Sequence, residues 1–228
     1  VTDYREVIKL QPNNEKAFYN IGDVLFLQGK YDKAMKEFTK AIALDKSYTY
    51  AYNDRGSCYR RLERYNDALI DYGRAIAISP KMAFIYNNIG STKKNMDDLP
   101  GAISAYNDAI TAEPDFYLAY NNRGTIYFQQ GKMEEALKDF EQSIKINPKY
   151  APAYSNRGVI MHKKEKYKEA LGDFDKAIQI NPNHANAYLN RGVTKEMIRD
   201  EAGACVDWKK ARDLGVSLGK RYYVNNCN

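Results

Sequence analysis

Residues 151–184 read APAYSNRGVIMHKKEKYKEALGDFDKAIQINPNH, and the same pattern recurs along the chain every 34 residues. Glycine marks one place in each unit, at Gly22, Gly56, Gly90, Gly124, Gly158 and Gly192. A second place holds alanine, at Ala34, Ala68, Ala102, Ala136, Ala170 and Ala204. Four residues after each alanine stands an aromatic: Phe38, Tyr72, Tyr106, Phe140, Phe174 and Trp208. A fixed period of this length predicts a repeat architecture built from one supersecondary unit.

Each unit is predicted to contain two helices. Apolar residues fall at helical spacing from Glu15 to Gln28, and Gly29 then provides a left-handed stop. The same spacing returns from Asp32 to Leu44. Prolines are expected to end the second helix in four units, at Pro80, Pro114, Pro148 and Pro182. A single helix pair cannot bury its apolar face alone, so the pairs must stack into an all-α fold.

This pattern resembles the tetratricopeptide repeat family over nearly the whole chain. The first aromatic place of the family pattern is taken by Phe18, Tyr52, Tyr86, Tyr120, Tyr154 and Tyr188. The resemblance implies an α-α superhelix, a solenoid of stacked antiparallel helix pairs with a C-terminal capping helix. The six repeats are placed at 15–48, 49–82, 83–116, 117–150, 151–184 and 185–218.

The two ends of the chain are predicted to differ from the repeats. Residues 1–14 fit the second helix of a preceding repeat, so the chain is expected to begin in mid-unit. Residues 219–228 are assigned to a capping helix and tail, which we expect to start near residue 216 with Leu218, Tyr222 and Tyr223 facing the last pair. Gly219 is expected to weaken this helix by about 1 kcal/mol. The tail also resembles the ending of repeat proteins from Bacteroidota-like bacteria.

Comparison of the repeats with one another predicts an ion pair inside four of them. Wherever arginine precedes the recurring glycine, aspartate stands sixteen residues later, and the two repeats with isoleucine lack it. The predicted structural pairs are Arg55 with Asp71, Arg123 with Asp139, Arg157 with Asp173, and Arg191 with Asp207. The alternative interpretation is that these arginines form a site for an anionic ligand.

The family resemblance implies that the first helices line a concave groove that binds an extended peptide or a partner helix. Asparagine is frequent at the fifth and sixth places of these helices, and its amide can pair with any peptide unit. This run is similar to the asparagine ladder of O-linked glycosyltransferase repeat domains, although asparagine at the sixth place also serves helix packing. The candidate peptide-binding residues are Asn53, Asn87, Asn88, Asn121, Asn122, Asn156, Arg60, Lys94, Phe128 and His162.

The groove places that would form a carboxylate clamp for chaperone C-termini hold other residues, such as Asn87 and Ser91. Arg60, Lys94 and His162 instead make the middle of the groove basic, with Phe128 as an apolar anchor. An acidic protein partner is therefore predicted, the alternative being that these charges only solvate the surface.

No constellation for catalysis is found, and no metal or cofactor is expected. The net charge of +6 is modest for nucleic-acid binding, and the three cysteines and two histidines are too scattered for a metal site. Cys205 and Cys227 form either a disulfide across the cap, which would imply a compartment such as a periplasm, or two free thiols. The localisation, cytoplasmic or periplasmic, and the oligomeric state stay open.

The function predicted from the sequence is a non-enzymatic protein–protein interaction module or scaffold. One alternative is that the repeats are the substrate-recognition arm of a larger enzyme, such as a glycosyltransferase. The other is an RNA-binding solenoid, against which most tyrosines fall at core places of the repeat and leave few stacking platforms.

Overall fold

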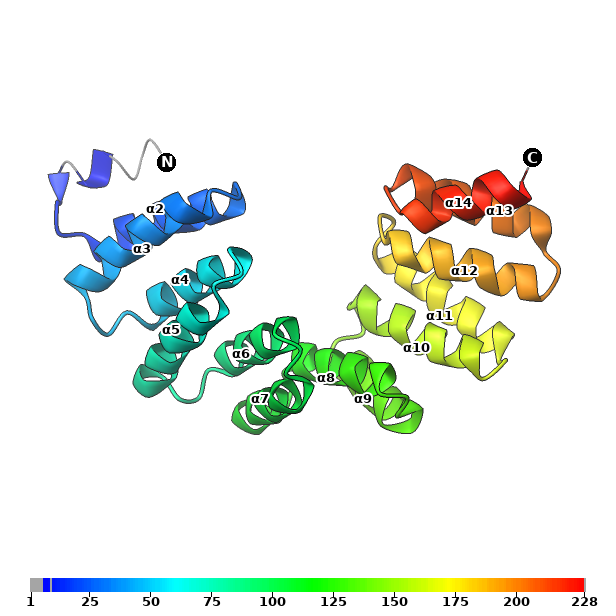
Figure 1. Ribbon diagram of the computed structural model, residues 1–228, viewed down its shortest axis with the longest axis horizontal. Helices are drawn as coiled ribbons and strands as arrows, with labels where there is room; N and C mark the ends of the chain where they lie inside the picture. The colour runs from blue at the N-terminus through cyan, green and yellow to red at the C-terminus, as the bar shows by residue number, and fades with distance from the viewer. Residues whose placement is uncertain (1–5, 9, 228) are drawn as a thin grey trace. The chain divides into compact units, whose positions relative to one another are not determined.

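The computed structural model describes residues 6–8 and 10–227, and in this part of the chain every regular element is a helix (Figure 1). The helix expected over residues 1–14 falls partly outside the described residues. The chain divides into two compact units, Val1–Ala119 and Tyr120–Asn228, which are described separately below. The predicted all-α class, built from stacked antiparallel helix pairs, is confirmed.

In unit 1, successive helices pack against one another in chain order, so that each repeat contributes one antiparallel pair. Apolar residues at helical spacing put a buried stripe on each helix, which includes Ala34, Phe38 and Ala41 on one helix. The first helices of successive repeats also touch one another. The helices are α2 (Glu15–Leu27), α3 (Tyr31–Leu44), α4 (Thr49–Arg61), α5 (Tyr65–Ile78), α6 (Ala83–Asn95) and α7 (Leu99–Ala112).

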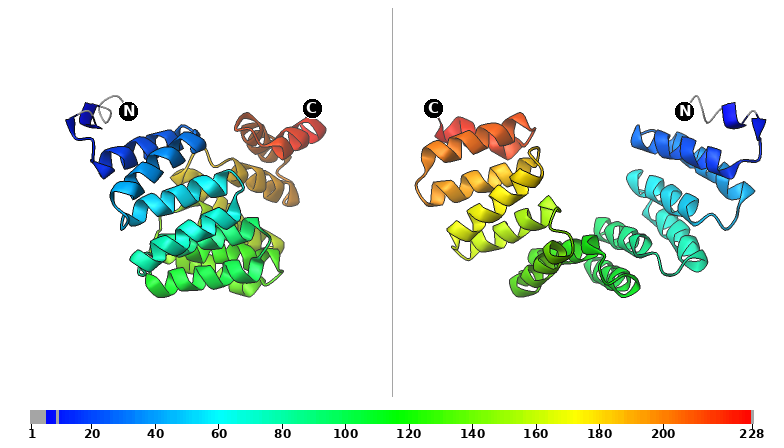
Figure 2. Two further views of the ribbon diagram at one scale, coloured as in Figure 1. Left: turned by 60° about the vertical axis from the view of Figure 1, so that its left-hand side comes forward. Right: turned by 180° about the vertical axis from the view of Figure 1, so that it is seen from behind.

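Unit 2 repeats the arrangement and adds one helix at its end, as the two further views in Figure 2 show. Its second helices end two residues before proline at Ile146 and Ile180, because the residue before a proline avoids the α conformation. The helices are α8 (Tyr117–Gln129), which starts at the end of unit 1, α9 (Met133–Ile146), α10 (Ala151–Lys163), α11 (Tyr167–Ile180), α12 (Ala185–Met197), α13 (Glu201–Asp213) and α14 (Ser217–Asn226).

The turn between the two helices of a repeat has one conformation throughout. A residue with positive φ ends the first helix in every repeat, and the next amide reaches back to the last turn of that helix, as Lys166 N does to Met161 O at 2.9 Å. Glycine fills this place only at Gly29 and Gly131. The other four residues tolerate a left-handed φ between 58° and 63°: Glu63, Asp97, Glu165 and Arg199.

The recurring glycine of each repeat allows the two helices to approach closely. A Cβ added at Gly158 would lie 2.8 Å from the ring of Phe174, and the same ring-over-glycine contact recurs in the other five repeats. The ring also reaches the next repeat, where Phe140 shares a buried cluster with Ile160. One aromatic side chain therefore fixes both the spacing within a pair and the stacking between pairs.

The last helix, α14, covers the final pair as expected. Tyr222 stacks on Trp208 with ring centroids 5.0 Å apart, and Tyr223 joins the same cluster. The expectation for Leu218 was wrong, since its side chain is 50% exposed. Gly219 is buried against Ala211 and the backbone of α13, and a Cβ there would clash. The glycine that was expected to weaken the cap is therefore what allows it to pack closely.

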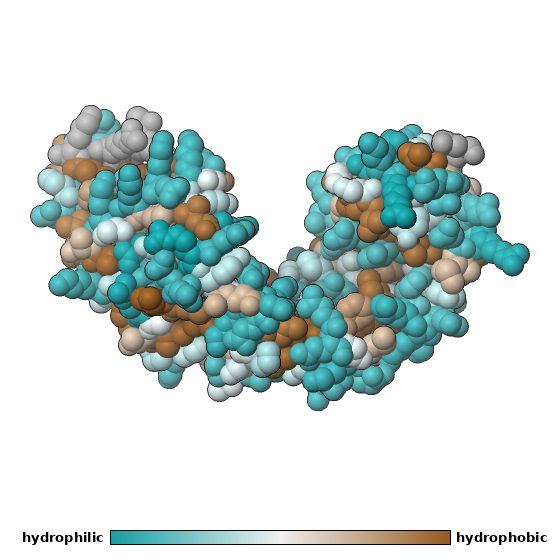
Figure 3. All heavy atoms as spheres, in the orientation of Figure 1, coloured by the Kyte–Doolittle hydropathy of each residue, from teal (hydrophilic) through white to brown (hydrophobic). Residues whose placement is uncertain are grey.

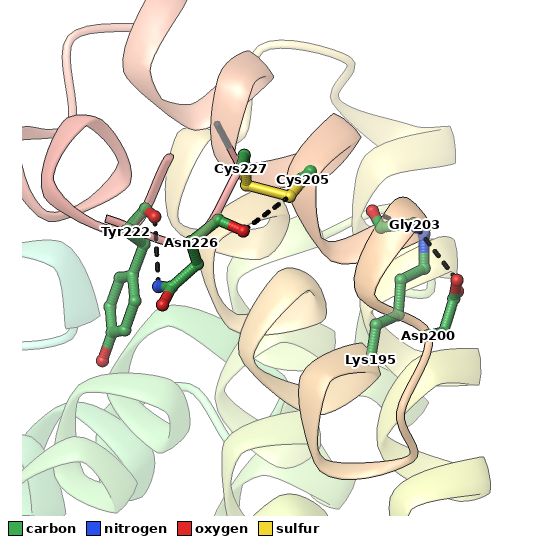
Figure 4. Close-up of a disulfide and its surroundings, with 7 residues drawn as sticks. All are labelled: Lys195, Asp200, Gly203, Cys205, Tyr222, Asn226 and Cys227. Carbon is green, nitrogen blue, oxygen red and sulfur yellow. Dashed lines mark hydrogen bonds between the residues drawn. A yellow bond between two sulfur atoms is a disulfide. The ribbon is translucent and has the colours of Figure 1, made fainter. Parts of the chain in front are cut away.

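A disulfide joins α13 to the end of the cap (Figure 4). Cys205 and Cys227 are its partners, with their Cα atoms 5.6 Å apart. Of the two alternatives for these cysteines, the structure has the cross-link. Cys58 is buried in the core of unit 1 as a free thiol, and burial raises its pKa to about 12. At neutral pH this thiol is not a nucleophile.

Candidate functional site

Bidentate arginine–aspartate pairs join the two helices of four repeats. Arg55 Nε lies 2.7 Å from Asp71 Oδ2, and Arg55 Nη2 lies 2.8 Å from Asp71 Oδ1. The same geometry, with distances of 2.5 to 2.9 Å, holds for Arg123 with Asp139, Arg157 with Asp173 and Arg191 with Asp207. The four carboxylates are buried, so these arginines are committed to the fold.

The four pairs differ in how many cations the carboxylate has. Asp71 also accepts from Arg74 Nη1 at 3.0 Å, and Lys195 Nζ lies 2.9 Å from Asp207 Oδ2. Within the described residues, Asp139 and Asp173 have no cation within 4 Å except their own arginine. The cost of losing the arginine should therefore differ among the four repeats.

We define the first-helix surface as the second, fifth, sixth, ninth, twelfth and thirteenth places of each repeat. In unit 1 it lies on α2, α4 and α6, and in unit 2 on α10, α12 and the part of α8 in that unit. Hydrogen bonds 35 residues apart join the fifth place of one repeat to the sixth place of the next. They run from Asn88 Nδ2 to Asn53 Oδ1 at 2.9 Å, from Asn156 Nδ2 to Asn121 Oδ1 at 2.9 Å, and from Tyr19 OH to Asp54 Oδ2 at 2.6 Å.

These bonds divide the candidate asparagines into two classes. Asn53 and Asn121 are each only 5% exposed, so little of either side chain is available for direct contact with a partner. Their carbonyl oxygens are used to hold the amides of Asn88 and Asn156, which are half-buried on the surface. Each of these outer amides keeps one N–H and its carbonyl oxygen beyond the bond described, because an amide has two donors and two acceptor lone pairs.

Asn87 and Asn122 are half-buried and have interactions of their own within the chain. They lie beside Asn88 on α6 and Asn121 on α8, at the fifth and sixth places respectively. The side chains of both residues are therefore engaged within the chain.

The basic and aromatic candidates occupy the twelfth place of successive repeats. Arg60 and Lys94 are half-buried on neighbouring helices of unit 1. In unit 2, His162 Nδ1 lies 2.9 Å from Thr194 Oγ1, and burial, with a smaller effect of Lys163, lowers the pKa of this imidazole. Lys163 Nζ also lies 5.6 Å from the ring centre of Phe128. Much of the face seen in Figure 3 is hydrophilic, with apolar residues interspersed.

Serine–tyrosine pairs at the ninth place were not foreseen from the sequence. Ser57 Oγ lies 3.2 Å from the hydroxyl of Tyr72, and Ser91 Oγ lies 3.2 Å from that of Tyr106. The signal was present, because these are the two repeats that have tyrosine rather than phenylalanine or tryptophan over the glycine, and the only two with serine at the ninth place.

A stacked pair of aromatic side chains at the second place of two neighbouring repeats was also not foreseen. Tyr50 and Phe84 stack with ring centroids 5.9 Å apart and planes inclined by 7°, and Tyr50 is 46% exposed. Their 34-residue spacing on the first-helix surface was visible in the sequence. Most tyrosines were expected at core places of the repeat, so this exposed pair was not foreseen.

Neither a metal centre nor a membrane span is found in the described part of the chain. No group of three or more His, Cys, Asp or Glu side chains there is arranged to hold a metal ion. No helix in those residues combines the length and the apolar composition needed to cross a bilayer.

Comparison with protein families decides the classification. The models described as "Tetratricopeptide repeat" match residues 49–82, 117–150 and 151–184, and also 3–36 and 85–116, while the model described as "TPR repeat" matches 22–62. The chain belongs to the tetratricopeptide repeat family. A search of curated proteins finds no match.

Several solved structures share the fold of this chain. The chain superimposes on one from the APC/C hetero-tetramer Cut9-Hcn1 with a TM-score of 0.85 at 14% identity, over 99% of this chain and 45% of that chain. A tetratricopeptide repeat protein from Parabacteroides merdae gives 0.73 at 20% identity, over 99% and 90%. YrrB, titled a TPR protein with an unusual peptide-binding site, gives 0.55 at 24% identity, over 81% and 95%.

Proposed function

We propose that this tetratricopeptide repeat chain is a non-enzymatic protein-interaction module that binds an extended segment of its partner on the first-helix surface. The family and the fold both support a protein-binding scaffold in general. The binding residues we assign are the outer amides Asn88 in unit 1 and Asn156 in unit 2. Asn53 and Asn121 act as positioning residues behind them.

The pre-arranged amides carry this proposal. A peptide unit offers one N–H and one C=O, and an asparagine that presents a carbonyl and one N–H can pair with both. The hydrogen bond from the sixth place to the preceding repeat holds the outer amide in one orientation, so less rotamer freedom is lost when a partner binds. Recognition through the peptide backbone would tolerate many side chains in the partner.

The YrrB structure supports the proposal as an analogy, because its title assigns a peptide-binding site to a protein of the same fold. The position of the site in this chain rests on the hydrogen bonds above and on nothing taken from that protein.

The proposal is tested by selecting binding peptides from a random phage-displayed library against the whole chain. The best peptide is then measured by fluorescence anisotropy against Asn88→Ala, Asn156→Ala and the parent chain. Each neutral hydrogen bond contributes about 0.5–1.5 kcal/mol, so loss of two bonds should weaken binding by roughly fivefold to a hundredfold in one of the variants.

Asn66→Ala is the matched control, because Asn66 is an exposed asparagine on the second helix α5. It should leave the affinity unchanged, and melting curves of all variants establish that they are folded. A library that yields no peptide, or a peptide whose affinity is the same for all three variants, would refute the proposed binding surface.

A further inference from the structure

Arg60 differs from every other half-buried arginine in the described residues. Those with intermediate exposure are Arg55, Arg60, Arg123, Arg157, Arg191 and Arg212. Five of the six have a carboxylate within 4 Å, at 2.5 to 2.7 Å. Arg60 has none among the described residues. A guanidinium is always charged, and a partly buried charge without a counter-ion is costly.

The surroundings of Arg60 do not replace the missing anion. Its Nε is buried and has no hydrogen-bond acceptor in the described part of the chain. The groups beside it are phenols: burial raises the pKa of Tyr72 and Tyr106, and the charge of Arg60 acts in the opposite direction on both. Phenols that stay protonated at neutral pH solvate a cation without neutralising it.

Arg60 is also placed where a partner would reach it. It lies in the last turn of α4, at the twelfth place of the first-helix surface, on the same helix as Asn53. Asp54 is the acidic residue of that helix, and its carboxylate is bound by Tyr19 and by Asn53 Nδ2 at 2.8 Å. Lys94 occupies the same place on the neighbouring helix α6, which increases the positive potential.

We propose that Arg60 is a carboxylate subsite, which receives an acidic group of the partner segment. The inference deepens the proposed function and rests on it, since it names the chemistry that the first-helix surface of unit 1 selects. The hydroxyls of Ser91 and Tyr106, 3.2 Å from each other, lie on the neighbouring repeat as neutral donors. One guanidinium with neutral donors matches a single negative charge, so we assign a carboxylate rather than a phosphate.

The experiment follows the Nε–Hε resonance of Arg60 by NMR in the whole chain with ¹⁵N-labelled arginine. The probes are Ac-Gly-Gly-Glu-Gly-Gly-NH₂, its Gln counterpart, and Ac-Gly-Gly-Gly with a free C-terminal carboxylate. Inorganic phosphate is the fourth probe. A saturable shift is expected with the Glu peptide, the free-carboxylate peptide, or both, and the comparison identifies the source of the carboxylate. The Gln peptide should bind about tenfold more weakly than the Glu peptide, because a charge-assisted hydrogen bond is stronger than a neutral one.

The resonance is assigned by its loss in Arg60→Gln, and Arg64→Gln is the control because Arg64 is exposed and lies after α4, outside the first-helix surface. The carboxylate response should persist in Arg64→Gln. If Arg60→Gln does not fold, Arg60→Lys removes the Nε resonance and keeps the charge. Equal shifts with the Glu and Gln peptides, or a response to phosphate alone, would overturn the assignment. The readout is separate from that for Asn88 and Asn156, so failure of the proposed function and failure of the Arg60 subsite can be told apart.

Discussion

Replacement of Arg123 by alanine should be among the most destabilising changes at a polar residue of this chain. The Arg123 guanidinium makes two hydrogen bonds to Asp139, of 2.9 and 2.7 Å, and the two side chains are 19% and 5% exposed. Without the arginine, Asp139 is a buried carboxylate with no other cation within 4 Å in the described part of the chain. Such losses cost about 3–5 kcal/mol, and the partial exposure of Arg123 places the expected cost near the lower end, at about 3 kcal/mol.

Urea unfolding followed by circular dichroism measures this free energy directly, and the melting temperature should fall by roughly 6–12 °C for a chain of this size. Lys138→Ala, at an exposed place on α9, is the control for an ordinary surface change. Arg191→Ala is the graded comparison, because Lys195 remains 2.9 Å from Asp207 and should limit the loss to about 1–2 kcal/mol. The reasoning is refuted if Arg123→Ala destabilises the chain no more than Lys138→Ala does.

Three further predictions concern unit 2. Gly158→Ala should destabilise this unit by about 1–3 kcal/mol because the new Cβ meets an aromatic ring. Gly172 has open space around it, so Gly172→Ala should stabilise α11 by about 0.5–1 kcal/mol, and urea unfolding measures both changes. Cys205 and Cys227 lie 22 residues apart, and reduction of their disulfide should remove about 3 kcal/mol of stability from the cap. The loss should appear as faster hydrogen exchange in α14, and three free thiols in unreduced, denatured protein would contradict the disulfide itself. Burial lowers the pKa of His184, so the unfolded state takes up the proton first as the pH falls through about 6.5. The stability should therefore decrease from pH 7.5 towards pH 5, and a pH series of melting temperatures should show a smaller decrease in His184→Gln. A decrease of the same size in that variant would exclude this histidine as the cause.

The fold could be predicted because the repeat presents the same packing problem six times. A glycine that must admit an aromatic ring recurs at a fixed distance from that ring, so the period of 34 residues is visible in a single sequence. The association of arginine with aspartate sixteen residues later had the same origin. When a side chain contacts the other helix of its pair, the residue type at the contacted position depends on it, as Arg157 and Asp173 show.

The candidate binding surface was harder to predict because residues at neighbouring places have different roles. Asn87 and Asn121 both stand at the fifth place, and nothing in the letter sequence shows that Asn121 is buried under Asn156. Burial on a solenoid depends on the neighbouring repeat, which helical periodicity within one repeat does not describe. Arg60 was grouped with Lys94 as a basic residue for the same reason, since its lack of a counter-ion is a property of its surroundings.

The turn after the first helix shows a different limit of prediction from the sequence. A left-handed residue is required in all six repeats, but glycine marks it only at Gly29 and Gly131. At Glu63 and Glu165 the tertiary packing outweighs a local preference of about 1 kcal/mol, so a search for glycine alone finds a third of these turns.

The hydrogen bonds that span 35 residues have a consequence for changes in the number of repeats. Because each bond links the fifth place of one repeat to the sixth place of the next, removal of residues 49–82 as a block would bring Tyr19 opposite Asn88, whose amide oxygen can accept the phenolic proton. Removal of a number of residues that is not a whole number of repeats would leave the fifth and sixth places of neighbouring repeats out of register. Whole units can therefore be gained or lost with the polar connection between neighbours intact, and the length of the array is free to vary in steps of one repeat.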